Sequence, residues 1–297
     1  MIRFRPFWCS FIIAIGIATP LISQESAIGD SSREPIWLVM ERGRLAFENR
    51  EYGEALLLFR EVKSRDTTAP EVDIAIGEVF EAEGELGIAL TQYLRALERS
   101  NLMTVPDDQI SLLYRIAGLY ERERNYQAFE EYLNLVILLV SRDNSIEQFE
   151  EPVIRILVRD GIDELIKLYR FGDHGAQQAY YRLGRFYIYD SARFIEATRM
   201  IALSVIMTLT EIADYALERD PTYRFDDVAQ LLEETLRFRR VADYLEESDF
   251  FEQLYALGHA LHASGRVGPA EEIRAYLRRL DPTGSAGRRA IRDYPTL

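Results

Sequence analysis

Small and hydrophobic residues recur at helical spacing in two short segments on either side of Gly84. Residues three or four positions apart share one face of a helix. The residues placed to face one another are Ile76, Gly77 and Phe80 in the first segment and Ala89, Tyr93 and Ala96 in the second. The pattern predicts two short helices packed antiparallel around Gly84, with the small residues allowing close approach of the two backbones.

The segment resembles a tetratricopeptide repeat, a helix pair of 34 residues with the pattern W-x2-L-G-x2-Y…A-x3-F…P. Asp73 stands where the family has Trp, and the closing Pro is absent. A preceding repeat, Trp37 to Arg65, carries the matching set Gly43, Tyr52, Ala55 and Phe59. Ala55 and Ala89 are 34 residues apart, which is the family period.

Further repeats follow with weaker matches. The third, over about 109–123 and 126–141, carries Ile116, Ala117, Tyr120, Ala128 and Tyr132, and its turn is one residue shorter than the family's. A divergent repeat carries Tyr180, Leu183, Gly184, Tyr187, Ala197 and Ile201. The last carries Leu254, Leu257, Gly258, Leu261, Gly265, Ala270 and Pro282, with Asp249 and Glu252 as a capping box before it.

The resemblance implies an all-α, right-handed superhelical solenoid of antiparallel helix pairs with a divergent centre. The expected organisation is a signal peptide over 1–23, a polar tether over 24–34, repeats over 35–141, a divergent helical region over 142–250 with one degenerate repeat, a repeat over 251–282, and a loose tail over 283–297. The apolar run 135–140 fits a buried strand or a buried helix, and its place in a helical pattern favours helix. The run 200–210 is too short to span a bilayer and is expected to be a core helix.

The N-terminus has the pattern of a secretory signal peptide. Arg3 and Arg5 precede an apolar stretch from Phe7 to Ala18, and residues 19–23 form a breaker. We therefore expect export to the periplasm or envelope, without membrane insertion after cleavage. The alternative is an uncleaved inner-membrane anchor. Cys9 is the only cysteine, so cleavage would leave no thiol for disulfides, thiolate metal sites or nucleophilic catalysis.

The formal net charge of −14 constrains the partners. Removing Arg3 and Arg5 with the signal peptide makes the mature chain more acidic still, at −16. Nucleic-acid binding requires Lys and Arg to neutralise phosphates, so a surface this acidic disfavours DNA and RNA. A protein or peptide partner is expected instead.

No motif predicts catalysis. His259 and His262 lie one helical turn apart and could share a metal, but no third ligand is apparent, and His174 lies in a turn. Nucleophile elbows, phosphate-binding glycine loops and zincin motifs are absent from the sequence. We expect no catalytic residues, no metal site and no cofactor.

The resemblance also implies where a partner binds, because the first helix of each repeat lines the concave side of the solenoid. Carried onto this sequence, the positions facing that side are Trp37, Met40, Arg44 and Phe47, then Glu71, Ile74, Glu78 and Glu81, then Ser111, Tyr114, Gly118 and Glu121. The candidate partner-binding residues are Trp37, Met40, Arg44, Ile74, Glu78, Glu81 and Tyr114, an apolar floor edged by carboxylates. Alternatively, Trp37 and Met40 merely pack the first helix. Glutamates at these positions disfavour the acidic C-terminal peptides that one subgroup of the family binds.

The function expected from these features is that of a non-catalytic adaptor or scaffold of the bacterial cell envelope, which binds another envelope protein in its concave groove. A competing hypothesis is an accessory small-molecule-binding component of an envelope transport system. Its ligand would contact the aromatic centre, Tyr180, Tyr181, Tyr187 and Tyr189. An enzyme with unrecognised carboxylate chemistry is the third alternative.

Overall fold

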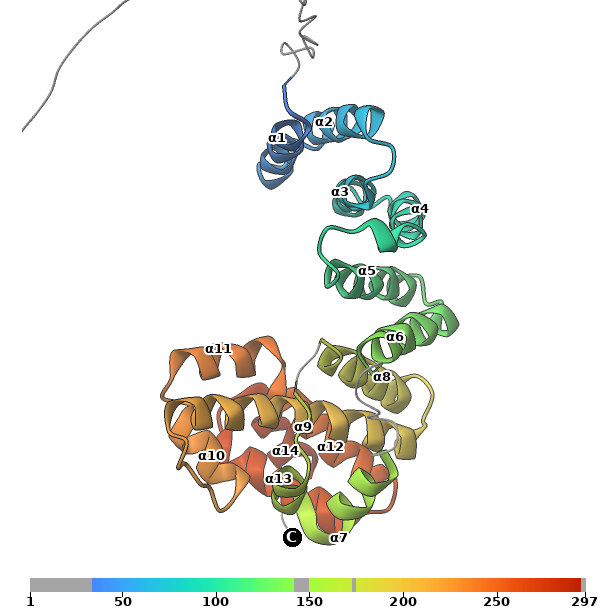
Figure 1. Cartoon of the computed structure of the whole chain (residues 1–297). Coiled ribbons are helices and arrows are strands. Elements are labelled where there is room, and N and C mark those ends of the chain that lie inside the picture. The colour runs from blue at the N-terminus through green and yellow to red at the C-terminus, as the bar shows by residue number, and fades with distance from the viewer. Residues whose placement is uncertain (1–33, 142–149, 173–174, 295–297) are drawn as a thin grey trace, which may run out of the picture.

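The computed structural model describes residues 34–141, 150–172 and 175–294. The expected signal peptide, Cys9, nearly all of the tether and His174 lie outside these residues. Within the described ranges every regular element is a helix, so the fold is all-α. The fold is an all-α solenoid of stacked helix pairs (Figure 1).

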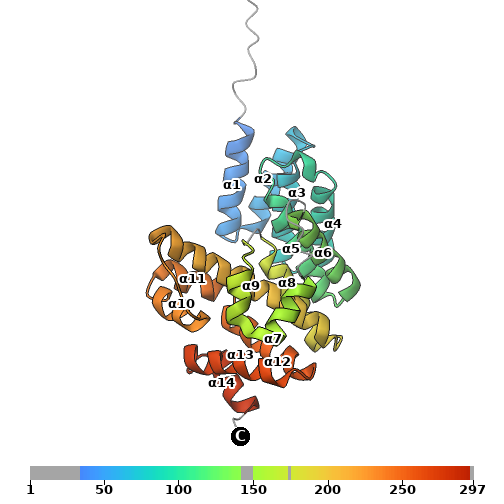
Figure 2. The ribbon, with the colours of Figure 1, turned by 60° about the horizontal axis from the view of Figure 1, so that its bottom comes forward.

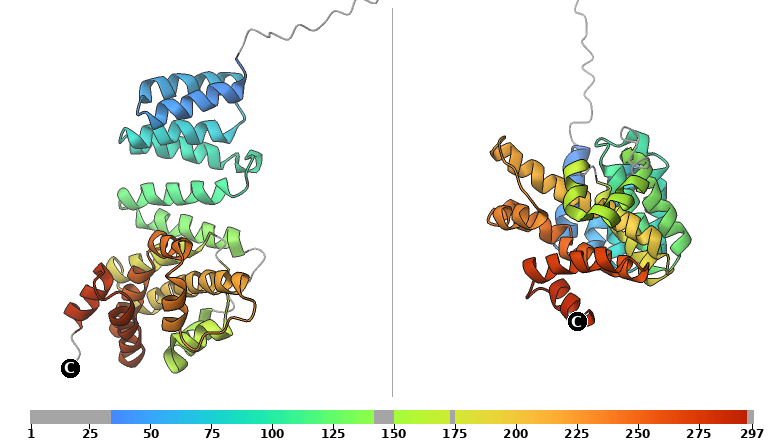
Figure 3. Two further views of the ribbon diagram at one scale, coloured as in Figure 1. Left: turned by 90° about the vertical axis from the view of Figure 1, so that its left-hand side faces the viewer. Right: turned by 90° about the horizontal axis from the view of Figure 1, so that it is seen from below.

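The N-terminal half consists of three antiparallel helix pairs stacked in chain order, which Figure 3 shows as successive layers. Each pair joins a first helix to a second helix through a tight turn. The pairs are α1 (Ile36–Glu48) with α2 (Tyr52–Arg65), α3 (Pro70–Ala82) with α4 (Leu86–Leu97), and α5 (Asp108–Arg122) with α6 (Tyr126–Ser141). The apolar run 135–140 is part of α6, so the helical alternative is confirmed and the strand is excluded.

Two further pairs continue the stack in the C-terminal half, and among the described residues three additional helices precede or separate them along the chain. The pairs are α8 (Gln177–Tyr189) with α9 (Phe194–Arg219), and α12 (Phe250–Ala263) with α13 (Val267–Leu280). The additional helices are α7 (Glu150–Leu168), α10 (Val228–Thr235) and α11 (Arg239–Glu247). Because α6 packs directly on α8, the solenoid continues past α7 without interruption.

The same turn closes four of the pairs. One residue with positive φ ends the first helix: Arg50 (63°), Gly84 (84°), Arg124 (58°) and Gly265 (81°). The next backbone N–H bonds the carbonyl five residues earlier, as in Glu85 to Phe80 O and Asn125 to Tyr120 O, a Schellman-type end. The turn of the third repeat is thus not shortened. Phe129, which is buried, occupies the position expected for Ala128.

Close packing within a pair depends on a glycine beneath a large side chain. An added Cβ at Gly43 would meet the Phe59 ring at 2.4 Å, and one at Gly77 would meet Tyr93 at 2.5 Å. Both rings are buried. The match of small residue to ring fixes the distance between the first and second helices of these two repeats.

Helix α9 is the longest described helix, with 26 residues, and forms the core of the C-terminal half. It packs against α7, α8, α10 and α12. By length and composition alone it is the one described helix that could span a membrane, but 72% of its most apolar window is buried in the protein. The apolar run 200–210 is therefore a core helix, as expected, although it belongs to a longer helix than its apolar residues indicate.

Within the described residues, the buried hydrophobic side chains form three clusters rather than one continuous core. A small cluster joins α1, α2 and α3, centred on Val39, Phe59 and Val79. A second joins α4 and α5 around Tyr93 and Ile116. The third and much the largest extends from α5 and α6 to the C-terminal helices.

The C-terminal segment corrects two expectations. The expected loose tail contains helix α14 (Ser285–Asp293), which packs on α12 and α13 (Figure 2) through buried Ala286 and Ala290. The many arginines of α14 make its sequence look polar, although its small residues form a narrow buried face. The expected capping box is also wrong, because Asp249 has φ 55° and caps no N–H with its side chain. Glu252 instead binds Arg289 and Ser285 of α14.

Candidate partner-binding groove

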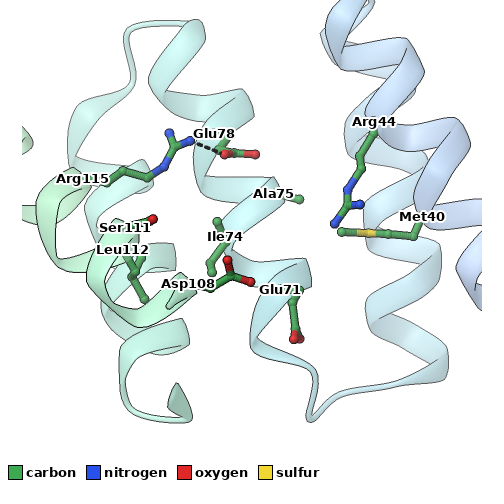
Figure 4. A pocket seen from close by; sticks show the side chains of 10 residues that line it. All are labelled: Met40, Arg44, Glu71, Ile74, Ala75, Glu78, Asp108, Ser111, Leu112 and Arg115. Atoms are coloured by element: carbon green, nitrogen blue, oxygen red, sulfur yellow. Dashed lines mark ion pairs between the residues drawn. The ribbon is translucent and has the colours of Figure 1, made fainter. Parts of the chain in front are cut away.

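A cleft of about 380 Å³ opens between the first helices of the three N-terminal pairs. Figure 4 shows it lying across α1, α3 and α5, with side chains from all three helices pointing into it. The lining residues are Met40 and Arg44 from α1; Glu71, Ile74, Ala75 and Glu78 from α3; and Asp108, Ser111, Leu112 and Arg115 from α5. We call this cleft the N-terminal groove.

The floor of the N-terminal groove is apolar. Ile74 and Met40 are partly exposed, whereas their neighbours Ala75 and Val39 are buried in the helix-pair core. This follows from helical periodicity, because a residue one position from a core residue lies at the edge of the buried face. Leu112, itself buried, contributes the third apolar side chain.

Ion pairs between α3 and α5 cross the groove and continue beyond it. Arg115 lies 2.6 Å from Glu78 and 3.9 Å from Glu81, and Arg122 lies 2.8 Å from Glu81. The Tyr93 hydroxyl donates to Glu81 at 2.9 Å. Burial of the Tyr93 ring, and then the negative charge of Glu81, raise the pKa of Tyr93. Glu81 therefore joins the core of the second repeat to the ion pairs at its surface.

Two charged side chains in the N-terminal groove have no partner among the residues that the structure describes. Neither the Arg44 guanidinium nor the Asp108 carboxylate makes an ion pair or hydrogen bond within the part of the chain that the structure describes. Glu71, in contrast, accepts a hydrogen bond from the Thr104 backbone N–H at 2.8 Å. Burial tends to raise the pKa of Glu71, but the hydrogen bonds from Thr104 outweigh it and the pKa is lowered. One cation and one anion of the groove are thus left to interact with a ligand.

Seven partner-binding residues were predicted from the sequence. Four of them line this groove: Met40, Arg44, Ile74 and Glu78. Three do not. Trp37 is 69% exposed on α1 outside the cleft, and Glu81 belongs to the ion pairs beyond it. Tyr114 lies at the joint between α5 and α8, where its hydroxyl donates to Gly175 O at 2.6 Å and accepts from the Ala179 N–H at 2.9 Å.

Sequence reasoning missed Arg115, Asp108 and Leu112, so an apolar floor edged by carboxylates was an incomplete description. The groove carries both signs of charge, including two arginines. Helical spacing could have indicated two of these residues, because Asp108 lies three residues before Ser111 and Arg115 four residues after it. Those separations place all three side chains on one face of α5.

The four tyrosines of the competing hypothesis do not line one cavity. Tyr180 and Tyr187 are buried in the largest hydrophobic cluster. Tyr181 and Tyr189 face a second cleft, between α8, α12 and α14. His259 accepts from or donates to the Tyr294 hydroxyl at 2.6 Å. No group of three or more His, Cys, Asp or Glu side chains among the described residues is arranged to hold a metal ion.

Comparison with known proteins finds distant similarity. No known protein-family model matches the chain. An uncharacterized protein of Treponema pallidum (strain Nichols) is 24% identical over 234 residues, 76% of this chain and 62% of that protein, so the chain spans less than two thirds of its relative. Pseudomonas aeruginosa PilF aligns over 87% of this chain and 97% of its own, at 14% identity and TM-score 0.40. The TPR2AB domain of yeast Sti1, in a complex with pHSP90, aligns over 86% of this chain and 95% of its own, at 12% identity and TM-score 0.33.

These similarities are too weak to carry an argument about function, and the fold class depends on the chain's own geometry. Antiparallel pairs with a glycine beneath an aromatic ring are the arrangement that the tetratricopeptide pattern predicts, and the recurring αL turn closes these pairs. The chain is a tetratricopeptide-like, all-α helical repeat protein.

Proposed function

We propose that the chain is a non-catalytic interaction scaffold that binds an extended segment of a partner protein in the N-terminal groove. The observation that carries this proposal is a pair of charges, Arg44 and Asp108, that have no partner among the described residues and lie beside an apolar floor. Charged groups that lack intramolecular partners are available for recognition, and a few side chains buried at the centre of an interface, arginine often among them, supply most of its affinity.

The groove fits a partner segment with three features. An apolar side chain would lie over Met40 and Ile74, an acidic group would reach Arg44, and a basic group would reach Asp108. The crossing pair Glu78–Arg115 would hydrogen-bond backbone groups of the segment without either charge being left unpaired. The net charge of −14 supports a peptide over a nucleic acid as the partner.

The compartment we propose is the bacterial cell envelope. The support is the N-terminal pattern of two arginines, an apolar stretch and a breaker. N-terminal sequencing of the protein isolated from its native source tests this. A mature chain beginning near Gln24 supports export, whereas an intact Met1 in membrane pellets favours the uncleaved anchor.

Site-specific crosslinking tests the groove. A photoreactive amino acid at Ser111 should crosslink one partner in the envelope fraction, and the same probe at Thr91, which is exposed on second helix α4, should not. The crosslinked segment, synthesised as a peptide, then provides the ligand for binding measurements. Met40→Ala with Ile74→Ala should weaken its binding by about 2 kcal/mol or more.

Matched controls separate recognition from general surface effects. Leu57 is 68% exposed on α2, and Leu57→Ala should leave binding unchanged. Arg44→Glu should weaken binding, whereas Arg60→Glu, on the exposed side of α2, should not. Equal crosslinking from Ser111 and Thr91, or binding that survives the Met40 and Ile74 changes in a folded protein, would contradict the proposal.

A further inference from the structure

A second cleft, of about 610 Å³, lies between α8, α12 and α14 in the C-terminal half. It is larger than the N-terminal groove, and its volume falls within the range of small-molecule sites. We call it the C-terminal cleft. Its lining residues are Tyr181, Arg185, Tyr189, Asp249, Glu252, Tyr255, Ala256, Arg289, Arg292 and Asp293.

The repeat geometry explains why these side chains converge. Tyr181 and Arg185 stand three residues before and one residue after Gly184. Met40 and Arg44 have the same positions relative to Gly43 in the N-terminal groove. Both pairs therefore project from the same face of a first helix. Tyr255 has the corresponding position before Gly258 in α12.

Most charges of the C-terminal cleft are already paired. Arg289 binds Glu252, and Arg292 lies 2.6 Å from Asp293, whose carboxylate also accepts the Tyr255 hydroxyl at 2.7 Å. Two charges remain. Across the described residues, the side chains of Arg185 and Asp249 make neither an ion pair nor a hydrogen bond. The Arg185 guanidinium lies over the Tyr181 ring, 5.6 Å from its centroid.

Aromatic rings form one wall of the cleft. Tyr189 and Tyr255 stack on His259, with ring centroids 6.1 Å and 6.5 Å from the imidazole. The Arg289 guanidinium lies 4.2 Å from the centroid of Tyr255. Tyr189 is 56% exposed, so its ring is accessible to a ligand. The wall thus offers flat apolar surface beside the two unpaired charges.

Asp249 is held in an unusual conformation at this place. Its φ of 55° lies in the left-handed region, although it is not glycine. Asp tolerates this region better than most residues, and the same conformation follows α1 and α5 at Arg50 and Arg124. The conformation ends α11 and begins α12, and Asp249 lines the cleft without capping α12 by its side chain.

We propose that the C-terminal cleft binds a small zwitterion with an aromatic body, of the free aromatic amino acid class. The ligand carboxylate pairs with Arg185, its ammonium pairs with Asp249, and its ring packs against the exposed ring of Tyr189. Guanidinium–carboxylate pairs are the strongest charge-assisted hydrogen bonds available to this site. Offset packing of aromatic rings adds to the affinity beyond the area that is buried.

Ligands with a single charge fit the cleft less well. An anion would meet Asp249, Glu252 and Asp293, and a cation would meet Arg185, Arg289 and Arg292. A molecule with both charges satisfies the unpaired group of each sign and leaves the existing pairs intact. The C-terminal cleft shares no lining residue with the N-terminal groove, so a ligand here does not depend on a partner bound there.

Isothermal titration calorimetry of the full chain with L-phenylalanine tests the proposal. Glycine, phenylacetate and phenethylamine serve as the analogues that lack the ring, the ammonium and the carboxylate. We expect saturable binding of L-phenylalanine, and binding at least tenfold weaker for each analogue. Arg185→Gln should weaken L-phenylalanine binding at least tenfold and leave phenethylamine binding unchanged. Asp249→Asn, which preserves tolerance of the left-handed region, should weaken L-phenylalanine binding equally and leave phenylacetate binding unchanged.

Matched controls come from an exposed ion pair of α11 that does not line the cleft. Arg239→Gln and Asp243→Asn remove the same charges there and should leave binding as in the wild type. Thermal unfolding without ligand establishes that every variant is folded. Absence of saturable L-phenylalanine binding to the wild-type chain overturns the proposal, and so does unchanged binding by a folded Arg185→Gln or Asp249→Asn variant. Neither result bears on Met40 and Ile74, so failure here leaves the N-terminal groove to its own test.

Discussion

The ring of Tyr93 covers Gly77 so closely that a Cβ on Gly77 would lie 2.5 Å from Tyr93 Cε1. Gly77→Ala must therefore displace a buried ring that also donates its hydroxyl to Glu81. Overpacking of this kind costs about 1–3 kcal/mol. We expect Gly77→Ala to lower the free energy of unfolding by that amount, measured by urea denaturation.

Gly87 provides the matched control within the same repeat. It lies in helix α4, and a Cβ there would meet no atom within 4 Å. Gly87→Ala should stabilise the protein by about 0.5–1 kcal/mol, because alanine favours helix over glycine. If the two substitutions had the same effect, the close packing of α3 on α4 would be refuted.

The carboxylate of Asp73, which is 1% exposed, binds both Lys63 of α2 and Arg99 just after α4. It thereby links the first two repeats at the position where the family has Trp. Asp73→Asn removes the charge that both cations share and should destabilise the protein by about 3 kcal/mol. The exposed pair Arg42–Glu34 is the control, and Arg42→Gln should cost less than about 1 kcal/mol. Urea denaturation of both variants distinguishes the two cases.

The Tyr114 hydroxyl joins the N-terminal pairs to the C-terminal half through its bonds to Gly175 and Ala179. Tyr114→Phe leaves the ring in place and removes both bonds, so we expect a loss of about 1–3 kcal/mol. Hydrogen exchange at the Ala179 amide should accelerate, since that N–H loses its acceptor. Ala179 protection equal to the wild type would show that the joint does not depend on this hydroxyl.

The pKa of His259 is lowered from 6.5, first by burial and then by the positive charges of Arg274 and His262, while Asp293 opposes the shift. The folded state therefore binds its proton at lower pH than the unfolded state does. It follows that His259 contributes stability above pH 6.5 that is lost as the pH falls toward the folded pKa. We expect the unfolding midpoint to fall between pH 7.5 and pH 5.5, and to fall less in His259→Gln. An identical pH dependence in both proteins would contradict this role.

The sequence pattern predicts local features well and distant contacts poorly. Each glycine–ring pair lies within one repeat and recurs 34 residues later in the next, so periodicity along the chain was sufficient to place them. The third repeat was misaligned by one residue because Ala128 looks like the small residue of the pattern, while Phe129 is the one buried. The role of Tyr114 depends on residues 61 and 65 positions away, which no local pattern indicates.

The same limit explains the C-terminal errors. The composition of α14 is dominated by charge, and only its contacts with α12 and α13 reveal that Ala286 and Ala290 are buried. Asp249 and Glu252 have the spacing of a capping box, but the Glu252 carboxylate pairs with Arg289 of α14 instead. Tertiary contacts override the local preference in both cases.

The division of the hydrophobic core into three clusters affects the order in which the parts of the protein unfold. Neighbouring repeats contribute to stability mainly through the interfaces they share, so a solenoid can lose its end repeats first. The first two helices rest on the small cluster around Phe59, whereas the C-terminal helices share the largest one. Amide protons of α1 and α2 should therefore exchange through partial opening, while those of α9 exchange only when the whole chain unfolds. A partner bound against Met40 in α1 would stabilise the repeat that unfolds first. Binding in the groove and folding of this end of the protein would therefore be thermodynamically coupled.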